Sequence, residues 1–135
     1  MRRIALRTLE RSSWVVRCRS FTFLPDPKAA AAHYGARLPI RRLPLLEGVP
    51  QTTGMRSGFV RLKPGETVGW HTTGQNEEAL VILRGEGAAL IEGHPKQAFA
   101  APALAYIPPA TRHNVENTGR ELLEYVYVVA PAKLP

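Results

Sequence analysis

The chain has 135 residues, of which 44% are apolar and 21% charged, and its formal net charge is +7. This length and composition are typical of one soluble globular domain. Pro, Gly or Arg interrupts every apolar run before it reaches the ~18 residues of a membrane-spanning helix, so a transmembrane protein is not expected. The single cysteine, Cys18, excludes an internal disulfide and a thiolate zinc cluster. We therefore expect a cytoplasmic protein, in which any metal site uses His, Asp, Glu and neutral oxygens.

The positive charge is confined to the beginning of the chain. Residues 1–50 carry ten Lys or Arg against three acidic residues, whereas residues 51–135 carry eight of each. Three interpretations of the Arg-rich residues 1–20 stay open: a tail that does not pack, a transit peptide, and an arm that binds nucleic-acid phosphates. No helix-turn-helix, RNP-like or zinc-finger pattern accompanies these arginines. A nucleic-acid partner is therefore not expected.

The first fifty residues predict a basic, Pro-rich extension. β-branched and aromatic residues within 14–23 favour a first strand. An alanine-rich segment favours a short helix over 28–34 that ends at Gly35. Five prolines between Pro25 and Pro50 predict an irregular course over the surface. We therefore place an extension, partly strand or disordered, at 1–50, and a β domain at 51–135.

Short strands separated by turn residues fill the rest of the chain. The expected strands are 57–63, 67–71, 79–84, 88–92, 97–100, 104–107, 112–117 and 121–130. Gly85-Glu86-Gly87 and Pro108-Pro109 are among the turn signals between them. Evenly spaced short strands without a long helix predict an all-β fold, either an antiparallel sandwich or a barrel.

Candidate metal ligands lie at the ends of these strands. His71 ends a strand-like run, and Glu77 and Glu78 follow it on a strand where only one of them can face inward. His113 opens another strand 42 residues after His71. Two imidazoles and a carboxylate that meet at one point form a facial triad typical of Fe(II), and Mn and Zn are further candidates. His94, in a Gly-His-Pro turn, is expected to be a turn residue.

The sequence around His71 resembles the first motif of the cupin superfamily, G-x5-H-x-H-x3/4-E-x6-G. It is matched by Gly65, His71, Glu78 and Gly85, with Thr73 in the place of the second His. This resemblance selects Glu78 over Glu77, because only Glu78 lies seven residues before Gly85.

The sequence around His113 resembles the second cupin motif, G-x5-P-x-G-x2-H-x3-N. It is matched by Pro108, His113 and Asn117, with Pro102 and Ala110 in the place of its two glycines. The resemblance covers about residues 55–130. It implies a double-stranded β-helix, or jelly-roll barrel, that holds a metal by His71, Glu78 and His113. It also implies a homodimer.

The resemblance implies a small single-domain cupin that binds a divalent metal (Fe, Mn, Ni or Zn) and a small polar molecule. Such a site suits a metal-dependent dioxygenase, isomerase or lyase, and the alternative is a non-catalytic binding or sensing module. Thr73, a candidate fourth ligand, leaves two outcomes open: a complete triad or a metal-free pocket. Candidate ligand-binding residues are Arg84, Tyr106 and Gln75. Tyr125 and Tyr127 are further candidates for the lining of a ligand pocket, although core packing or cross-strand pairing is the favoured interpretation of aromatic residues on strands.

Overall fold

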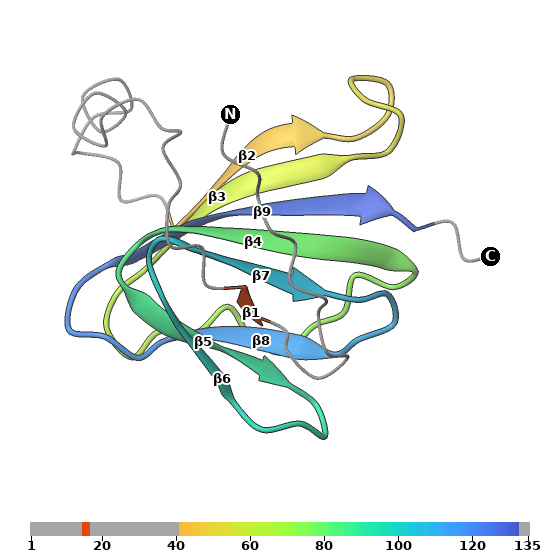
Figure 1. Cartoon of the computed structure of the whole chain (residues 1–135). Coiled ribbons are helices and arrows are strands. Elements are labelled where there is room, and N and C mark those ends of the chain that lie inside the picture. The colour runs from red at the N-terminus through yellow and green to blue at the C-terminus, as the bar shows by residue number, and fades with distance from the viewer. Residues whose placement is uncertain (1–14, 17–40, 133–135) are drawn as a thin grey trace, which may run out of the picture.

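The computed structural model describes residues 15–16 and 41–132, and these residues form nine strands (Figure 1). The strands are β1 (Val15–Val16), β2 (Arg42–Glu47), β3 (Arg56–Leu62), β4 (Asn76–Arg84), β5 (Glu86–Ile91), β6 (Gln97–Ala100), β7 (Ala103–Ile107), β8 (His113–Asn117) and β9 (Leu123–Pro131). Among the described residues, no helix is long and apolar enough to cross a membrane. The all-β prediction is confirmed.

Two antiparallel sheets make up the fold. The larger sheet has the order β1-β7-β4-β9-β3-β2, and the smaller has the order β6-β5-β8. In Figure 1 the smaller sheet lies below the larger one, and both sheets supply the buried apolar core between them. The core includes Leu80 and Ile82 from β4, Ile91 from β5, and Val115 from β8.

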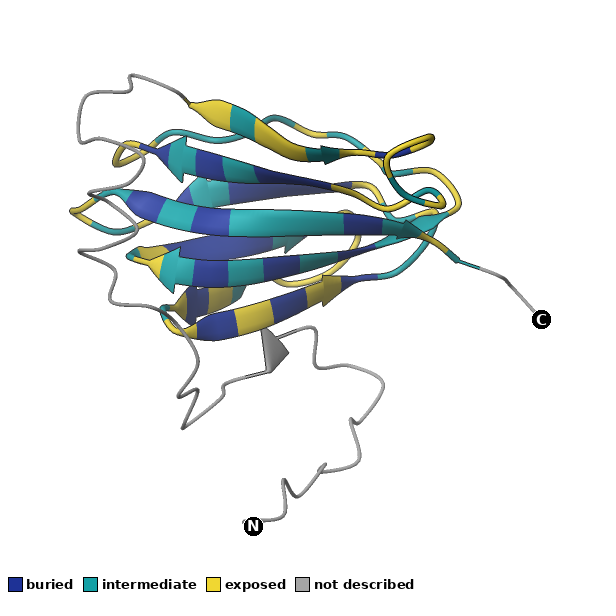
Figure 2. Ribbon diagram, turned by 90° about the horizontal axis from the view of Figure 1, so that it is seen from above, coloured by how far each residue is buried: buried dark blue, intermediate teal, exposed yellow. Residues whose placement is uncertain are grey.

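Burial alternates along the strands, as the dark and light bands of Figure 2 show. On β4, Glu78, Leu80 and Ile82 are buried, and each intervening residue is partly exposed. Successive side chains of a strand point to opposite faces, so this alternation fixes which face lies on the core. The position of Glu78 in this series points its carboxylate into the molecule.

The larger sheet begins before residue 51. β2 pairs with β3 and lies at the edge of the sheet, with a register shift between Pro44 and Leu46. Proline is tolerated at a sheet edge because no neighbouring strand needs its missing N–H. The expectation of an irregular segment is therefore wrong for the residues of β2. β1 falls within the first expected strand, whereas residues 17–23 and the expected helix over 28–34 lie outside the described residues.

The strand expected over 67–71 is replaced by isolated bridges. Thr67 pairs with Glu116 and His71 pairs with His113, but the residues between them form no continuous ladder. Gly69 interrupts the ladder because its φ of 95° is left-handed. The Asn114 side-chain oxygen accepts a hydrogen bond from the Gly69 N–H at 2.9 Å. The segment therefore stays attached to β8 and keeps His71 in place.

Ala110 occupies a position where the cupin motif has glycine, and its φ is 55°. A Cβ in this left-handed conformation costs roughly 1–2 kcal/mol, whereas the greater freedom of glycine in the unfolded chain costs about 0.4–1 kcal/mol. Ala110→Gly is therefore expected to raise the free energy of unfolding by about 0.5–1 kcal/mol, measured by urea denaturation. Ala98→Gly, at an exposed position of β6, is the control and should lower it by roughly 0.5–1 kcal/mol. A similar loss in both variants would contradict this account of Ala110.

Candidate metal centre

A β-bridge positions the two candidate histidine ligands. His71 and His113 exchange backbone hydrogen bonds, each with an N···O distance of 2.9 Å. Directly opposed residues of an antiparallel pair place their side chains on the same side. The two imidazole ring centroids accordingly lie 4.3 Å apart, with 57° between the ring planes.

The backbone also fixes the tautomer of both imidazoles. His71 Nδ1 lies 2.8 Å from the Gly69 carbonyl oxygen, and His113 Nδ1 lies 3.0 Å from the Thr111 carbonyl oxygen. A carbonyl oxygen only accepts, so each Nδ1 carries a hydrogen, and in the neutral imidazole the lone pair is then on Nε2. Metal-binding histidines typically use one ring nitrogen as ligand and donate the other N–H to such a partner.

Glu78 on β4 completes a group of three candidate ligands. One ligand atom from each of His71, Glu78 and His113 lies within 4.8 Å of the others. Glu78 Oε2 is 2.9 Å from His113 Nε2, and the side chains are 6% and 0% exposed. The contact lacks hydrogen-bond geometry, and within the described part of the chain neither buried atom has a hydrogen-bond partner. Two buried lone-pair donors at this distance need a proton or a metal cation between them, so the donor set fits a divalent metal.

The environment of His113 acts on its pKa in two directions. Burial lowers the pKa of the imidazole, whereas the Glu78 carboxylate and the Thr111 carbonyl oxygen raise it, and the net pKa lies above the ordinary 6.5. Burial also raises the pKa of the Tyr125 hydroxyl, and the Glu78 carboxylate raises it further. Tyr125 is therefore a neutral phenol at physiological pH.

The three candidate ligands line a cavity of about 250 Å³. Its lining consists of Arg42, Arg56, Val60, His71, Thr72, Thr73, Glu78, His113, Val115, Tyr125, Tyr127 and Val129. Sequence reasoning missed both arginines. Arg42 lies on the strand that was not expected, and Arg56 stands one residue before the expected start of β3. The two-residue alternation of β3 was the available signal, because it places Arg56 on the face of Val60 and Leu62.

The three candidate ligand-binding residues lie outside the lining of this cavity. Arg84 is exposed and pairs with Glu121 at 3.6 Å, because a register shift after Ile82 ends the regular alternation of β4. The Tyr106 hydroxyl is exposed and donates to Glu77 Oε2 at 3.0 Å. Gln75 is exposed in the turn before β4.

Two further motif residues have local backbone partners. Thr73 lines the cavity, but its hydroxyl donates to the Asn76 carbonyl oxygen at 3.0 Å. Asn117 accepts a hydrogen bond from the Gly119 N–H at 2.9 Å, as expected for a turn-forming asparagine. Its amide also donates to the Leu62 and Glu121 carbonyl oxygens, at 2.9 and 2.7 Å. Asn117 therefore supports the fold at the end of β8.

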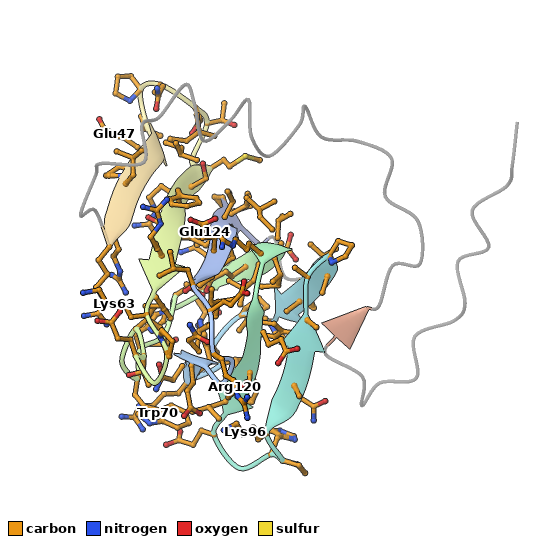
Figure 3. All side chains as sticks on the ribbon, turned by 90° about the vertical axis from the view of Figure 1, so that its left-hand side faces the viewer. Glu47, Lys63, Trp70, Lys96, Arg120 and Glu124 are labelled. Atoms are coloured by element: carbon orange, nitrogen blue, oxygen red, sulfur yellow. The ribbon has the colours of Figure 1, made fainter. Side chains whose placement is uncertain are left out.

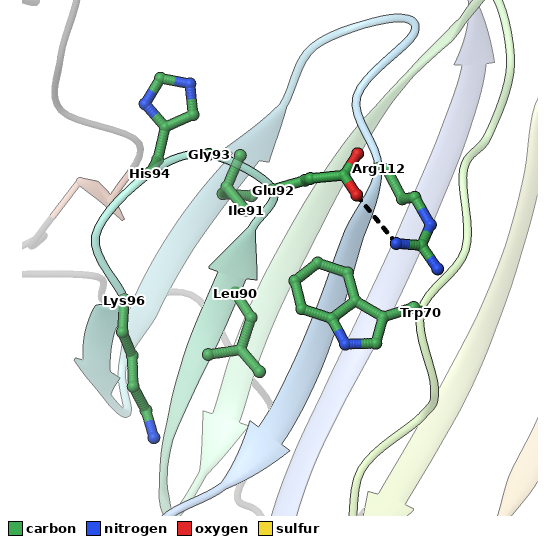
Figure 4. A pocket seen from close by; sticks show the side chains of 8 residues that line it. All are labelled: Trp70, Leu90, Ile91, Glu92, Gly93, His94, Lys96 and Arg112. Carbon is green, nitrogen blue, oxygen red and sulfur yellow. Dashed lines mark hydrogen bonds and ion pairs between the residues drawn. The ribbon is translucent and has the colours of Figure 1, made fainter.

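A second hollow, of about 350 Å³, is lined by residues that include Trp70, Glu92 and Arg112 (Figure 4). The Arg112 guanidinium lies 5.3 Å from the centroid of the Trp70 ring and donates to Glu92 Oε1 at 2.9 Å. In Figure 3, Trp70 and Lys96 lie at one end of the molecule and Glu47 at the other. Trp70 and Arg112 each precede a histidine ligand, so alternation turns them outward. Glu92 therefore already balances the charge of Arg112 in this hollow.

Comparison with known proteins decides the family. A model described as the cupin domain matches residues 58–129, which is more than half of the chain. The chain belongs to the cupin superfamily. The antiparallel two-sheet structure is accordingly the double-stranded β-helix of cupins, and the motif resemblance is confirmed.

Solved cupin structures show the same fold. A protein of Bacillus halodurans is 20% identical with a TM-score of 0.64, and the match covers 85% of each chain. The Cnp3 cupin domain of Schizosaccharomyces pombe is 16% identical with a TM-score of 0.61, covering 67% of this chain and 64% of that one. Oxalate decarboxylase of Bacillus subtilis is 25% identical with a TM-score of 0.53, but the match spans 57% of this chain and 21% of the enzyme. No curated protein matches the sequence.

Proposed function

We propose that this cupin binds a divalent metal through His71, Glu78 and His113, and that its cavity takes a small polar molecule. The observation that carries the proposal is the buried contact between His113 Nε2 and Glu78 Oε2, which has no hydrogen-bond geometry. Two histidines and one carboxylate are typical of non-haem iron sites, and Mn, Ni and Zn accept the same donors. A bound ion would supply Lewis-acid polarisation or, as iron, dioxygen activation.

The chain's own residues orient the ligands and shield them from water. The Gly69 and Thr111 carbonyl oxygens hold the two imidazoles, and burial keeps water from Glu78 and His113. The residues that line the cavity include no carboxylate or imidazole besides the three ligands. Dioxygenase, isomerase or lyase chemistry at this site would therefore have no separate protein base of that kind.

The same lack of a separate base in the cavity lining favours a second candidate, a non-catalytic binding or sensing module. Such a module would gain thermal stability from its ligand without converting it. Turnover of a ligand by the metal-loaded protein, followed by product analysis, separates the two candidates. Product that accumulates beyond one equivalent supports the enzyme, and stabilisation without product supports the module.

Metal content after anaerobic loading with Fe(II) or Mn(II) tests the proposal, measured by plasma mass spectrometry on untagged protein. Wild type is expected to retain about one equivalent, and Glu78→Gln and His113→Ala should lower metal affinity by more than about tenfold. Glu77→Gln is the matched control and should bind like wild type, because Glu77 pairs with the exposed Tyr106 hydroxyl. Undetectable metal in loaded wild type, or equal loss in Glu77→Gln, would contradict the proposal.

The remaining expectations for this cupin concern its assembly and location. The family resemblance implies a homodimer, and we keep the cytoplasm as the proposed location, with no nucleic-acid or membrane partner. Light scattering during size-exclusion chromatography tests the dimer against the 14.9 kDa mass of one chain.

A further inference from the structure

Two arginine side chains line the cavity together with the metal triad. Arg56 on β3 is opposite Val129 on β9, and Val129 is opposite Glu78 on β4. Directly opposed residues of neighbouring strands share a face of the sheet. Arg56 and Glu78 therefore belong to one inward-facing row. Their backbones are separated by two strand spacings, each of about 4.8 Å.

A second inward-facing row carries the other arginine. Arg42 on β2 is opposite Val60 on β3, and Val60 is opposite Tyr125 on β9. Val60 and Tyr125 are 1% and 2% exposed, so this row faces the core. Both arginines therefore line the same cavity, and because both are exposed they lie at its open side, formed by β2 and β3.

Neither of the two arginines that line the cavity has an acidic partner among the described residues. Four basic side chains of the described residues pair with glutamates, namely Arg61, Arg84, Lys96 and Arg112. Within the same described part of the chain, neither Arg42 nor Arg56 forms an ion pair or a side-chain hydrogen bond.

The charge of the residues that line the cavity is therefore unbalanced. Glu78 is the single carboxylate of its lining, and it faces His113. A divalent ion held by Glu78 would increase the positive charge of the cavity further. Such a cavity attracts an anionic organic ligand.

The space that remains is small and partly occupied by aromatic rings. Tyr127 lies over Gly58, where a Cβ would come within 2.5 Å of the Tyr127 hydroxyl oxygen. The cavity volume of about 250 Å³ is below the roughly 300–1,000 Å³ typical of sites for drug-sized ligands. The ligand therefore has only a few carbon atoms.

We propose that the small polar ligand is a carboxylate anion, which Arg42 and Arg56 bind while its other end faces His71, Glu78 and His113. A guanidinium group matches the planar carboxylate with two parallel hydrogen bonds. The placement of the ligand's other end beside His71, Glu78 and His113 rests on the proposed function. Binding of its carboxylate by the two arginines does not require a bound metal. It assigns the binding role to these two arginines, in place of Arg84.

Calorimetric titration of metal-free and Mn(II)-loaded protein with malonate, succinate and glutarate tests the inference. Wild type is expected to bind at least one of these dicarboxylates and to reject its neutral diamide. Arg42→Gln and Arg56→Gln should each weaken binding by about tenfold, and the double variant by about a hundredfold. Arg84→Gln is the matched control and should stay within about twofold of wild type, because its exposed ion pair lies outside the cavity.

Metal content, measured on the same samples, separates this inference from the proposed function. Metal-loaded wild type that binds none of the dicarboxylates overturns the inference, and so does equal affinity in the double variant. Preference for inorganic phosphate over every dicarboxylate also overturns it. Loss of dicarboxylate binding in the double variant supports the inference even where wild type takes up no metal, and in that case only the proposed metal site fails.

Discussion

Gly85→Ala is expected to lower the free energy of unfolding by about 3–5 kcal/mol. Gly85 connects β4 of the larger sheet to β5 of the smaller one, and its φ is 85°. A Cβ there would overlap the Leu122 carbonyl oxygen and lie 3.0 Å from Leu123 Cα. Both neighbours are backbone atoms, so no side-chain rotation relieves the overlap. The left-handed conformation and the steric overlap act together, which explains why the first cupin motif ends on this glycine.

Urea denaturation of Gly85→Ala beside Gly93→Ala separates the two contributions. Gly93 has a φ of 77°, and a Cβ at this position would have nothing within 4 Å. Gly93→Ala should therefore cost only the conformational part, about 0.5–1 kcal/mol once the lower freedom of alanine in the unfolded chain is subtracted. Equal losses in the two variants would contradict a role for the contact with Leu122.

Saturation with metal is expected to raise the free energy of unfolding by about as much as Gly85→Ala lowers it. At a free metal concentration of about 1,000 times Kd, binding to the folded state alone adds about 4 kcal/mol to the free energy of unfolding. The stabilisation should be present with Fe(II) or Mn(II), disappear on addition of a chelator, and return when metal is restored. Denaturation curves recorded at several metal concentrations measure it.

Glu78→Gln is the informative variant for this stabilisation, because it preserves the side-chain volume at a position that is 5% exposed. Metal-free Glu78→Gln should fold, and its denaturation midpoint should hardly change with metal. Glu77→Gln should respond like wild type. A metal response of Glu78→Gln equal to that of wild type would show that the stabilising ion binds elsewhere.

Much of the fold was predictable because it follows from local rules. Runs of strand-forming residues located β3 to β9, and turn residues separated them. Motif spacing distinguished Glu78 from Glu77, and the structure buries Glu78 beside His113. These features depend only on the spacing of residues along the chain, so they can be predicted from the sequence.

The residues that the sequence did not reveal depend on pairing between distant strands. Arg42 enters the cavity only because β2 pairs with β3, and proline in β2 obscured that strand. Arg84 is an even number of residues after Glu78, so regular alternation would place both side chains on the same face of β4. The register shift after Ile82 and the end of the strand instead place Arg84 outside the cavity. Likewise, Gly69 interrupts the strand expected before His71 without displacing the histidine. Registers and irregularities of this kind are decided by tertiary packing.

Anomalous diffraction from crystals of the Mn(II)- or Fe(II)-loaded protein tests the central claim most directly. The account predicts a peak between the Nε2 atoms of His71 and His113 and the carboxylate of Glu78. A peak at another place, such as the hollow beside Trp70 and Glu92, would contradict it. The absence of any peak, in crystals grown from protein that carries one equivalent of metal, would contradict it equally.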